Sequence, residues 1–247
     1  MTGHLKNKMK TSLTTDSIND FIDLLHNNKW FCSLPNEIQA TILAEAEIIH
    51  FMKDDHVFRT RDIFDGIYAV LEGAVQLSYT DVHGNDAVAA IADPIMWFGE
   101  ISLVDDQPRT HDAICVKNST ILYLTEDILR GLLHQYPTFW FHIAQLTSHK
   151  LRVICAELIS IQTQSLQQRL THRLWFILNG YGNHLQIENL TISITQDQLA
   201  SMLFCARQSI NLELQHLERE KIIHLAFKKI QILDLARLKQ LAEGASL

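Results

Sequence analysis

The stretch ITQDQLASML at residues 194–203, followed by FCA and then RQSINLELQHLE at residues 207–218, decides the fold of the C-terminal third. Thr195 and Gln198 have the spacing of a capping box, in which the threonine hydroxyl and the glutamine side chain each satisfy a free N–H of the first turn. The apolar residues that follow recur at helical spacing on both sides of the short break at Phe204 and Cys205. Two short helices joined by so tight a turn predict a helix-turn-helix, whose second helix fits a DNA major groove.

Polar side chains on the outward face of this predicted motif have the chemistry to read bases. Arginine can bond guanine, glutamine or asparagine can bond adenine, and an apolar side chain can touch a thymine methyl. The residues that we expect to contact DNA are Thr195, Gln196, Arg207, Gln208, Ser209, Asn211 and Leu212.

Two β-like runs at residues 222–225 and 230–233 flank Phe227, Lys228 and Lys229, which predicts a wing with Lys228 placed for phosphates. Double-stranded DNA containing an inverted repeat is therefore the expected partner. The alternative is a helical hairpin that binds no nucleic acid.

A long apolar seam precedes this region. Its members step by four and three in strict alternation over nearly four heptads, which is an a/d pattern. They are Trp140, Ala144, Thr147, Leu151, Ile154, Leu158, Ile161 and Ser165. We expect a long helix over residues 137–166 that forms a parallel homodimer, with packing against its own domain as the alternative.

The N-terminal half has a different texture. Residues 1–17 show no periodicity and predict a mobile extension, and helical patterns follow at about 18–26 and 35–46. From residue 48 to about 125 short β-type runs alternate with turns. The alternation of Val75, Leu77 and Tyr79 with polar residues, a turn at 81–86 and a second run at 87–92 predict a hairpin. Strands at such short spacing indicate a sandwich, barrel or roll.

Composition limits the function classes. The chain has 247 residues, 47% of them apolar, and a net charge of −7, but residues 166–247 hold 9 basic and 7 acidic residues, so that only this part is net positive. No apolar run is long enough to span a bilayer and no secretory signal is present, so we expect a cytoplasmic protein without a membrane partner.

Motifs for chemistry are missing. The four cysteines form no CxxC pair, the 13 histidines form no ligand set, and we expect no metal. No Walker loop, GxSxG elbow or HExxH motif occurs, so we expect no catalytic residues and no enzyme.

The order of roll, long helix and winged helix resembles the catabolite activator/fumarate–nitrate regulator (CRP/FNR) family of bacterial transcription factors, over about residues 21–242. Three motifs carry the resemblance: FGEISL at 98–103 with QPRT at 107–110, LEGAV at 71–75, and the helix-turn-helix stretch quoted above. The first is similar to the family's phosphate-binding cassette. The resemblance implies a homodimeric DNA-binding transcription regulator that also contacts RNA polymerase.

The resemblance further implies an effector site at Gly99, Glu100, Arg109 and Thr110 for a cyclic nucleotide, cyclic AMP or cyclic GMP. Glu100 would accept from a ribose hydroxyl, and Arg109 and Thr110 would bind the phosphate, for which a guanidinium fork is well suited. A Glu100–Arg109 ion pair that braces the loop without a ligand is the alternative.

The chain departs from the family pattern at several positions. Glycine turn positions hold Arg61, Ile95 and Phe204. Since a bulky residue at positive φ costs roughly 1–2 kcal/mol, we expect these turns to have changed shape. The Thr-Ser pair that contacts adenine aligns with Ile154 and Cys155, which lack hydroxyls, so the base that the pocket selects is open.

Two smaller departures are His111, where alanine is common, and Ala206, where a serine cap is usual.

The sequence therefore predicts an α+β protein in four parts. They are an extension (1–17), a cyclic-nucleotide-binding-like β-roll, or jelly-roll, sensor domain (18–136), a dimerisation helix (137–166) and a winged helix-turn-helix domain (167–247). Two other functions remain open. One is an effector-independent regulator with a degenerate pocket, and the other is a nucleotide-binding module whose winged helix binds protein.

Overall fold

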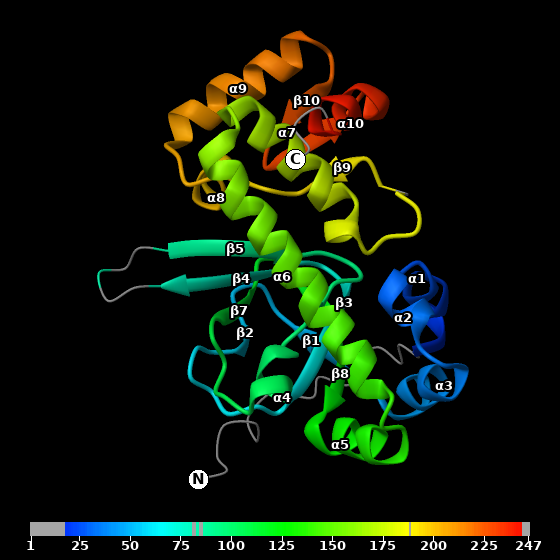
Figure 1. Ribbon diagram of the computed structural model, residues 1–247. Coiled ribbons are helices and arrows are strands. Elements are labelled where there is room, and N and C mark those ends of the chain that lie inside the picture. The colour runs from blue at the N-terminus through cyan, green and yellow to red at the C-terminus, as the bar shows by residue number, and fades with distance from the viewer. Residues whose placement is uncertain (1–17, 81–82, 84–85, 188, 244–247) are drawn as a thin grey trace.

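The computed structural model describes residues 18–80, 83, 86–187 and 189–243. The extension predicted for residues 1–17 lies outside these ranges. Figure 1 shows a roll of strands below, a winged helix above, and one long helix that runs between them.

The predicted roll is present and consists of two antiparallel four-stranded sheets. One sheet has the order β1–β8–β3–β6 and the other the order β2–β7–β4–β5. The strands are β1 (Glu47–Phe51), β2 (His56–Phe58), β3 (Gly66–Glu72), β4 (Val75–Thr80), β5 (Asp86–Ala92), β6 (Trp97–Phe98), β7 (Asp112–Cys115) and β8 (Ser119–Thr125). The predicted hairpin is confirmed, because β4 pairs with β5 from Val75 opposite Ala92 to Thr80 opposite Asp86.

Helices precede and follow the roll in sequence, and one short helix, α4, is inserted between β6 and β7. They are η2 (Ile18–Phe21), α1 (Ile22–His26), α2 (Lys29–Ser33), α3 (Asn36–Glu45), α4 (Ile101–Asp105) and α5 (Glu126–Gln135). The short α2 was not predicted. It begins where the Asn28 side chain accepts a hydrogen bond from the Phe31 amide at 2.9 Å, and the apolar side chains of Trp30 and Phe31 are buried.

The predicted long helix is α6 (Phe139–Thr163), which ends earlier than the seam suggested. Ser165 is not a seam residue. It forms a capping box with Gln168 and begins a separate helix, α7 (Leu166–Leu178). A cap needs the extended backbone that Ser165 adopts, and that conformation cannot continue the preceding helix.

The C-terminal domain has the predicted winged helix-turn-helix. Its elements after α7 are η3 (Gly180–Gly182), β9 (Thr191–Ile192), α8 (Gln196–Met202), α9 (Arg207–Arg219), β10 (Ile223–Ala226), β11 (Lys229–Ile232) and α10 (Leu235–Glu243). The Thr195–Gln198 capping box is confirmed. The wing strands β10 and β11 form a sheet with β9, a two-residue strand that was not predicted.

The prediction that three turns have changed shape is wrong for two of them, which retain the positive-φ conformation of a glycine turn. Arg61 has φ +70° and Phe204 has φ +52°, so these side chains adopt the left-handed conformation that glycine favours. Hydrogen bonds impose it: the Arg61 amide donates to the Arg109 carbonyl at 2.8 Å, and the Phe204 amide donates to the Ser201 carbonyl at 3.2 Å. Ile95 does not have a positive φ, so its turn differs.

The roll and the winged helix share one hydrophobic core. Apolar side chains of β4, β5 and β7 pack continuously with those of α7, α8 and α9. Polar contacts accompany them. The Val88 amide on the edge strand β5 donates to Ser201 Oγ at 3.0 Å, and Gln198 Nε2 donates to Gln76 Oε1 at 3.0 Å. The sensor edge is therefore covered by the first helix of the helix-turn-helix, as seen at β5 and α8 in Figure 1.

Glycine at position 73, in the LEGAV motif, is required by the strand-turn-strand geometry. Gly73 has φ +89°, and a Cβ there would lie 2.5 Å from the Asn118 carbonyl oxygen. We expect Gly73→Ala to lower the free energy of unfolding by more than about 1–2 kcal/mol, because backbone strain and a backbone clash act together.

Gly131 in α5 is the matched control, since no atom beyond its own turn of helix lies within 4 Å of the place that an added methyl group would take. Gly131→Ala should be neutral or stabilise by about 0.5–1 kcal/mol. Urea unfolding followed by circular dichroism measures both variants. Equal midpoints for Gly73→Ala and wild type would contradict this account.

Candidate effector pocket and DNA-reading helix

The cassette is a β6–α4 turn followed by a loop that leads into β7. Gly99 has φ +94° and a Cβ there would come within 2.9 Å of Arg109 Nη1, so glycine lets the loop close over the guanidinium. Arg109 is only 3% exposed. Its guanidinium carbon lies 4.4 Å from the ring centre of Phe58 and 4.9 Å from that of Phe64.

Both ends of the Arg109 fork have partners within the chain. Nη1 donates to the Gly99 carbonyl at 2.6 Å, and Nη2 donates to Asp65 Oδ1 at 2.5 Å and to the Gly66 carbonyl at 2.7 Å. Asp65 is itself held by the Tyr68 hydroxyl at 2.7 Å. The guanidinium is thus neutralised by a carboxylate and oriented by two carbonyl groups. Its Nε, however, is buried and has no hydrogen-bond partner.

Glu100 pairs with a lysine from α6. Lys150 Nζ lies 2.6 Å from Glu100 Oε2, and Glu100 is fully buried. The other oxygen, Oε1, is buried and unpartnered. The alternative of a Glu100–Arg109 ion pair is therefore wrong. Glu100 pairs with Lys150 of α6, and Arg109 pairs with Asp65 from the turn before β3.

Thr110 and His111 lie beside this pair of charged groups. Thr110 is exposed and its Oγ1 lies 2.8 Å from His111 Nδ1. Burial, reinforced by the positive charge of Lys150, lowers the pKa of His111 to about 4, so the imidazole is neutral near pH 7. His111 Nε2 is also buried without a partner. The cassette and the adjoining face of α6 therefore bring together two cations, Arg109 and Lys150, and three unpartnered buried polar atoms, on Glu100, Arg109 and His111.

The α6 seam lies on the outside of the chain. Leu151, Ile154 and Leu158 are 59%, 55% and 57% exposed, and Ile161 and Trp140 are 37% and 43% exposed. Ala144 is also exposed, and Thr147 is half-buried. Cys155 is exposed beside Ile154, so neither residue contributes to the core of its own sensor domain.

The DNA-reading face has a fully exposed part and a braced part. Arg207, Gln208 and Leu212 are exposed, whereas Ser209 and Asn211 are half-buried. Ala206 provides no side-chain cap for α9, as expected from its alanine side chain. Arg207 instead has an exposed ion pair across the turn, with Nη1 3.3 Å from Asp197 Oδ2.

Hydrogen bonds at the start of α8 and between α8 and α9 hold the remaining predicted DNA-contacting side chains in place. Gln196 Nε2 donates to Asn211 Oδ1 at 3.1 Å, which couples one predicted base-reading side chain from each helix. The Thr195 hydroxyl is occupied in the capping box. At the wing tip Lys228 is exposed, with Nζ 5.2 Å from the ring of Phe227, and Phe227 is 87% exposed.

Asp65 and Lys150 were missed by the sequence analysis. Lys150 carried a signal, because it falls four residues after Leu146 on the buried stripe of Phe139, Ile143 and Leu146, where a lysine needs a partner. Asp65 carried none, since an aspartate in a turn before a strand is ordinary.

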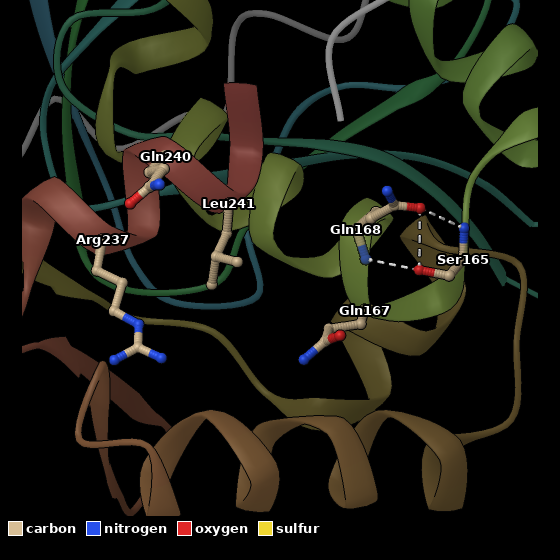
Figure 2. Close-up of a pocket in the computed structure, with 6 residues that line it drawn as sticks. All are labelled: Ser165, Gln167, Gln168, Arg237, Gln240 and Leu241. Carbon is tan, nitrogen blue, oxygen red and sulfur yellow. Dashed lines mark hydrogen bonds between the residues drawn. The ribbon is translucent and has the colours of Figure 1, made fainter. Parts of the chain in front are cut away.

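A broad groove of about 860 Å³ between the start of α7 and α10 was also not predicted (Figure 2). Its one charged side chain, Arg237, donates to Glu220 at 2.8 Å.

Neither a metal site nor a membrane span is found in the described ranges. No group of three or more histidine, cysteine or acidic residues could hold a metal ion there. Within the same residues no helix has the length and apolar character needed to cross a bilayer.

Together these features define a two-domain protein in which a sensor roll is joined by a long helix to a winged helix. Residues 48–136 match the family of cyclic nucleotide-binding domains, and residues 168–241 match the Crp-like helix-turn-helix domain. The transcriptional regulator SdrP of Thermus thermophilus is 30% identical over 73% of this chain and 85% of its own. The cyclic AMP receptor protein of the same organism is 25% identical, over 76% and 84%.

Solved structures have a similar fold. A CRP/FNR-family regulator from Thermus thermophilus is 27% identical, with a TM-score of 0.59 over 80% of this chain and 98% of its own. FixK2 from Bradyrhizobium japonicum shares the fold at 14% identity, with a TM-score of 0.68 over 79% and 96%. The chain belongs to the CRP/FNR family, and it is a DNA-binding transcription regulator.

Proposed function

We propose that the chain acts as a homodimer that binds an inverted DNA repeat, under the control of a small anionic effector in the β-roll. The observation that carries the proposal is the Glu100–Lys150 ion pair, which ties the cassette to the dimerisation helix. The four parts predicted from sequence belong to this proposal, with the dimerisation helix limited to α6, Phe139–Thr163. RNA polymerase is proposed as a further partner and the cytoplasm as the site of action.

The exposed seam supports the dimer. Leu151, Ile154 and Leu158 project large apolar side chains from one face of a 25-residue helix, and each is more than half exposed in the single chain. A second copy of α6 would bury this stripe in the manner of a two-stranded coiled coil. The dimer then presents two α9 helices to successive major grooves, which is the geometry of an inverted repeat.

The charges in the cassette support an anionic effector. Arg109 and Lys150 are both buried or largely buried, and three polar atoms of the cassette lack partners. An anion would compete with Asp65 for Arg109, and a hydroxyl donated to Glu100 would release Lys150 from it. Because Lys150 belongs to α6, that exchange links occupancy of the roll to the placement of the dimerisation helices.

Cyclic AMP and cyclic GMP are the first candidates. The cyclic AMP receptor protein of Thermus thermophilus is a relative, and the roll belongs to the cyclic nucleotide-binding domains. Ile154 and Cys155 offer no hydroxyl to a base, so we expect selectivity between bases to differ from that of a protein with the Thr-Ser pair.

The dimer is tested at Leu158. Leu158→Asp places two carboxylates in one apolar seam, where an unpaired charge is severely unfavourable. In sedimentation experiments the wild type should be a dimer at micromolar concentration and the variant a monomer. Ile63→Asp, at an 84% exposed position of the roll, is the control and should stay dimeric. A monomeric wild type would contradict the proposal.

DNA reading is tested at Arg207. On a selected site, Arg207→Ala should lose about 1–3 kcal/mol of binding free energy and relax specificity at one base pair. Lys228→Ala should instead weaken binding to all sequences alike and flatten its salt dependence. Arg130→Ala removes an exposed guanidinium of α5 and should leave binding unchanged. Wild-type affinity of Arg207→Ala in fluorescence anisotropy would show that the reading helix is wrongly assigned.

The effector is tested by thermal unfolding with cyclic nucleotides. At a hundred times its dissociation constant a ligand should stabilise the fold by about 2.7 kcal/mol, which raises the melting temperature by several degrees. Arg109→Ala should abolish the shift, and Arg109→Lys should restore part of it because a point charge replaces the fork.

Lys150→Met separates binding from coupling. The nucleotide should still raise the melting temperature of this variant but should no longer change its affinity for DNA. No shift with any cyclic nucleotide, together with full DNA binding by the free protein, would establish the effector-independent alternative. Nucleotide binding without retention of any DNA would favour a winged helix that binds protein.

A further inference from the structure

A second cavity lies between the β-roll and the winged helix, where several segments of the chain meet. It has a volume of about 330 Å³. Its lining comes from α1, the turns between β3 and β4 and between β5 and β6, the loop between β7 and β8, the end of α7 and the segment that leads into β9. Leu24, Asp93, Lys117, Ile177, Asn189 and Ile192 line it. The sensor and the winged helix therefore both contribute to one space.

Hydrogen bonds hold these walls in place. The Asn27 side chain donates to the Gln186 carbonyl at 3.2 Å and accepts from the Gln186 amide at 2.9 Å. Buried Asn28 donates to the Ile95 carbonyl at 2.9 Å, and the Lys29 amide donates to the Asn183 carbonyl at 2.8 Å. Because each wall is fixed through its backbone, the space is preformed, as small-molecule sites usually are.

Two charged groups in the cavity lack partners. Asp93 is the acid among the lining residues, and no described residue donates a hydrogen bond to its carboxylate or forms an ion pair with it. Burial raises the pKa of Asp93 to about 6, against the opposing influence of Lys117. Lys117 also lines the cavity, and its ammonium has no ion pair with a described side chain. Asp93 and Lys117 are both half-buried, and a half-buried charge without an ion pair can be stabilised by a ligand group of the opposite sign.

We propose that this cavity binds a small zwitterion of the α-amino-acid class with an aliphatic side chain. Its ammonium would pair with Asp93 and its carboxylate with Lys117, assisted by the amide of Asn189. The apolar side chain would lie against Leu24, Ile177 and neighbouring aliphatic groups. A molecule the size of leucine fits within the volume, and one occupant would satisfy both charges at once. Since the walls belong to both domains, that occupant stabilises their docked arrangement.

Calorimetry on the full chain tests the site, with L-leucine, L-valine and L-methionine as probes. At least one should bind, and its two half-analogues should bind at least ten-fold more weakly. For leucine these are 3-methylbutylamine, which lacks the carboxylate, and 4-methylpentanoate, which lacks the ammonium. Failure of all three amino acids to bind, or equal binding by the amine alone, would overturn the proposal.

Two variants assign the contacts. Asp93→Asn keeps the shape of the side chain and removes its charge, and Lys117→Gln removes the positive charge contributed by the loop between β7 and β8. Each variant should weaken binding of the amino acid at least ten-fold. The melting temperature of the ligand-free Asp93→Asn protein should stay at or above that of the wild type. Wild-type affinity in either variant would overturn the assignment. Arg109→Lys should leave amino-acid binding unchanged, which separates this site from the effector site of the roll.

Discussion

The ion pair between Lys150 of α6 and Glu100 of the cassette is the constraint on which the rest of the structure depends, because it joins the long helix to the β-roll. The ion pair is nearly enclosed, with 20% of the lysine side chain and 1% of the glutamate side chain exposed. Removing one partner from such a pair leaves an isolated charge and is strongly destabilising. In the mechanism that we propose, a ligand that offers Glu100 another partner would act through this ion pair on the position of α6.

The Arg109 guanidinium is held in one orientation by contacts that also neutralise its charge. Asp65 and two backbone carbonyls orient the guanidinium, and aromatic rings enclose it. These contacts fix the geometry in advance, but they also set a threshold, because an incoming anion must exceed the attraction of Asp65. Under the proposed function, an anion would therefore have to compete with Asp65 for Arg109 as well as fit the cassette.

The edge of the β4–β5 sheet meets the helix-turn-helix directly. Strand β5 is the last of its sheet, and an uncovered edge exposes backbone groups to unwanted pairing. Ser201 satisfies one of those groups at Val88, and Gln198 combines its role in the capping box with a bond to Gln76. The same side chains therefore stabilise the first helix of the DNA-reading motif and its docking on the sensor.

Local signals in the sequence were sufficient for most of the fold. Several features depend on neighbours within a few residues, and the sequence therefore predicted them. They are the Thr195–Gln198 capping box, the β4–β5 hairpin, the α6 seam and the wing. Elements whose stability comes from tertiary packing were not predicted: α2 is held by Asn28 and buried aromatic side chains, and β9 by its pairing with β11. The left-handed conformation of Arg61 likewise depends on a hydrogen bond from its amide to the Arg109 carbonyl, and that of Phe204 on a bond to the Ser201 carbonyl.

The sequence by itself determined the two-domain architecture and the residue types at the pocket and the DNA-reading face. Only the tertiary structure decided which charges meet. Glu100 is 50 residues from Lys150, and Arg109 is 44 residues from Asp65. No periodicity or motif spans such separations, because the partner of a buried charge is chosen by how sheets and helices pack. The cavity with Asp93 and Lys117 has the same origin, since its lining comes from separate segments that only the folded chain brings together.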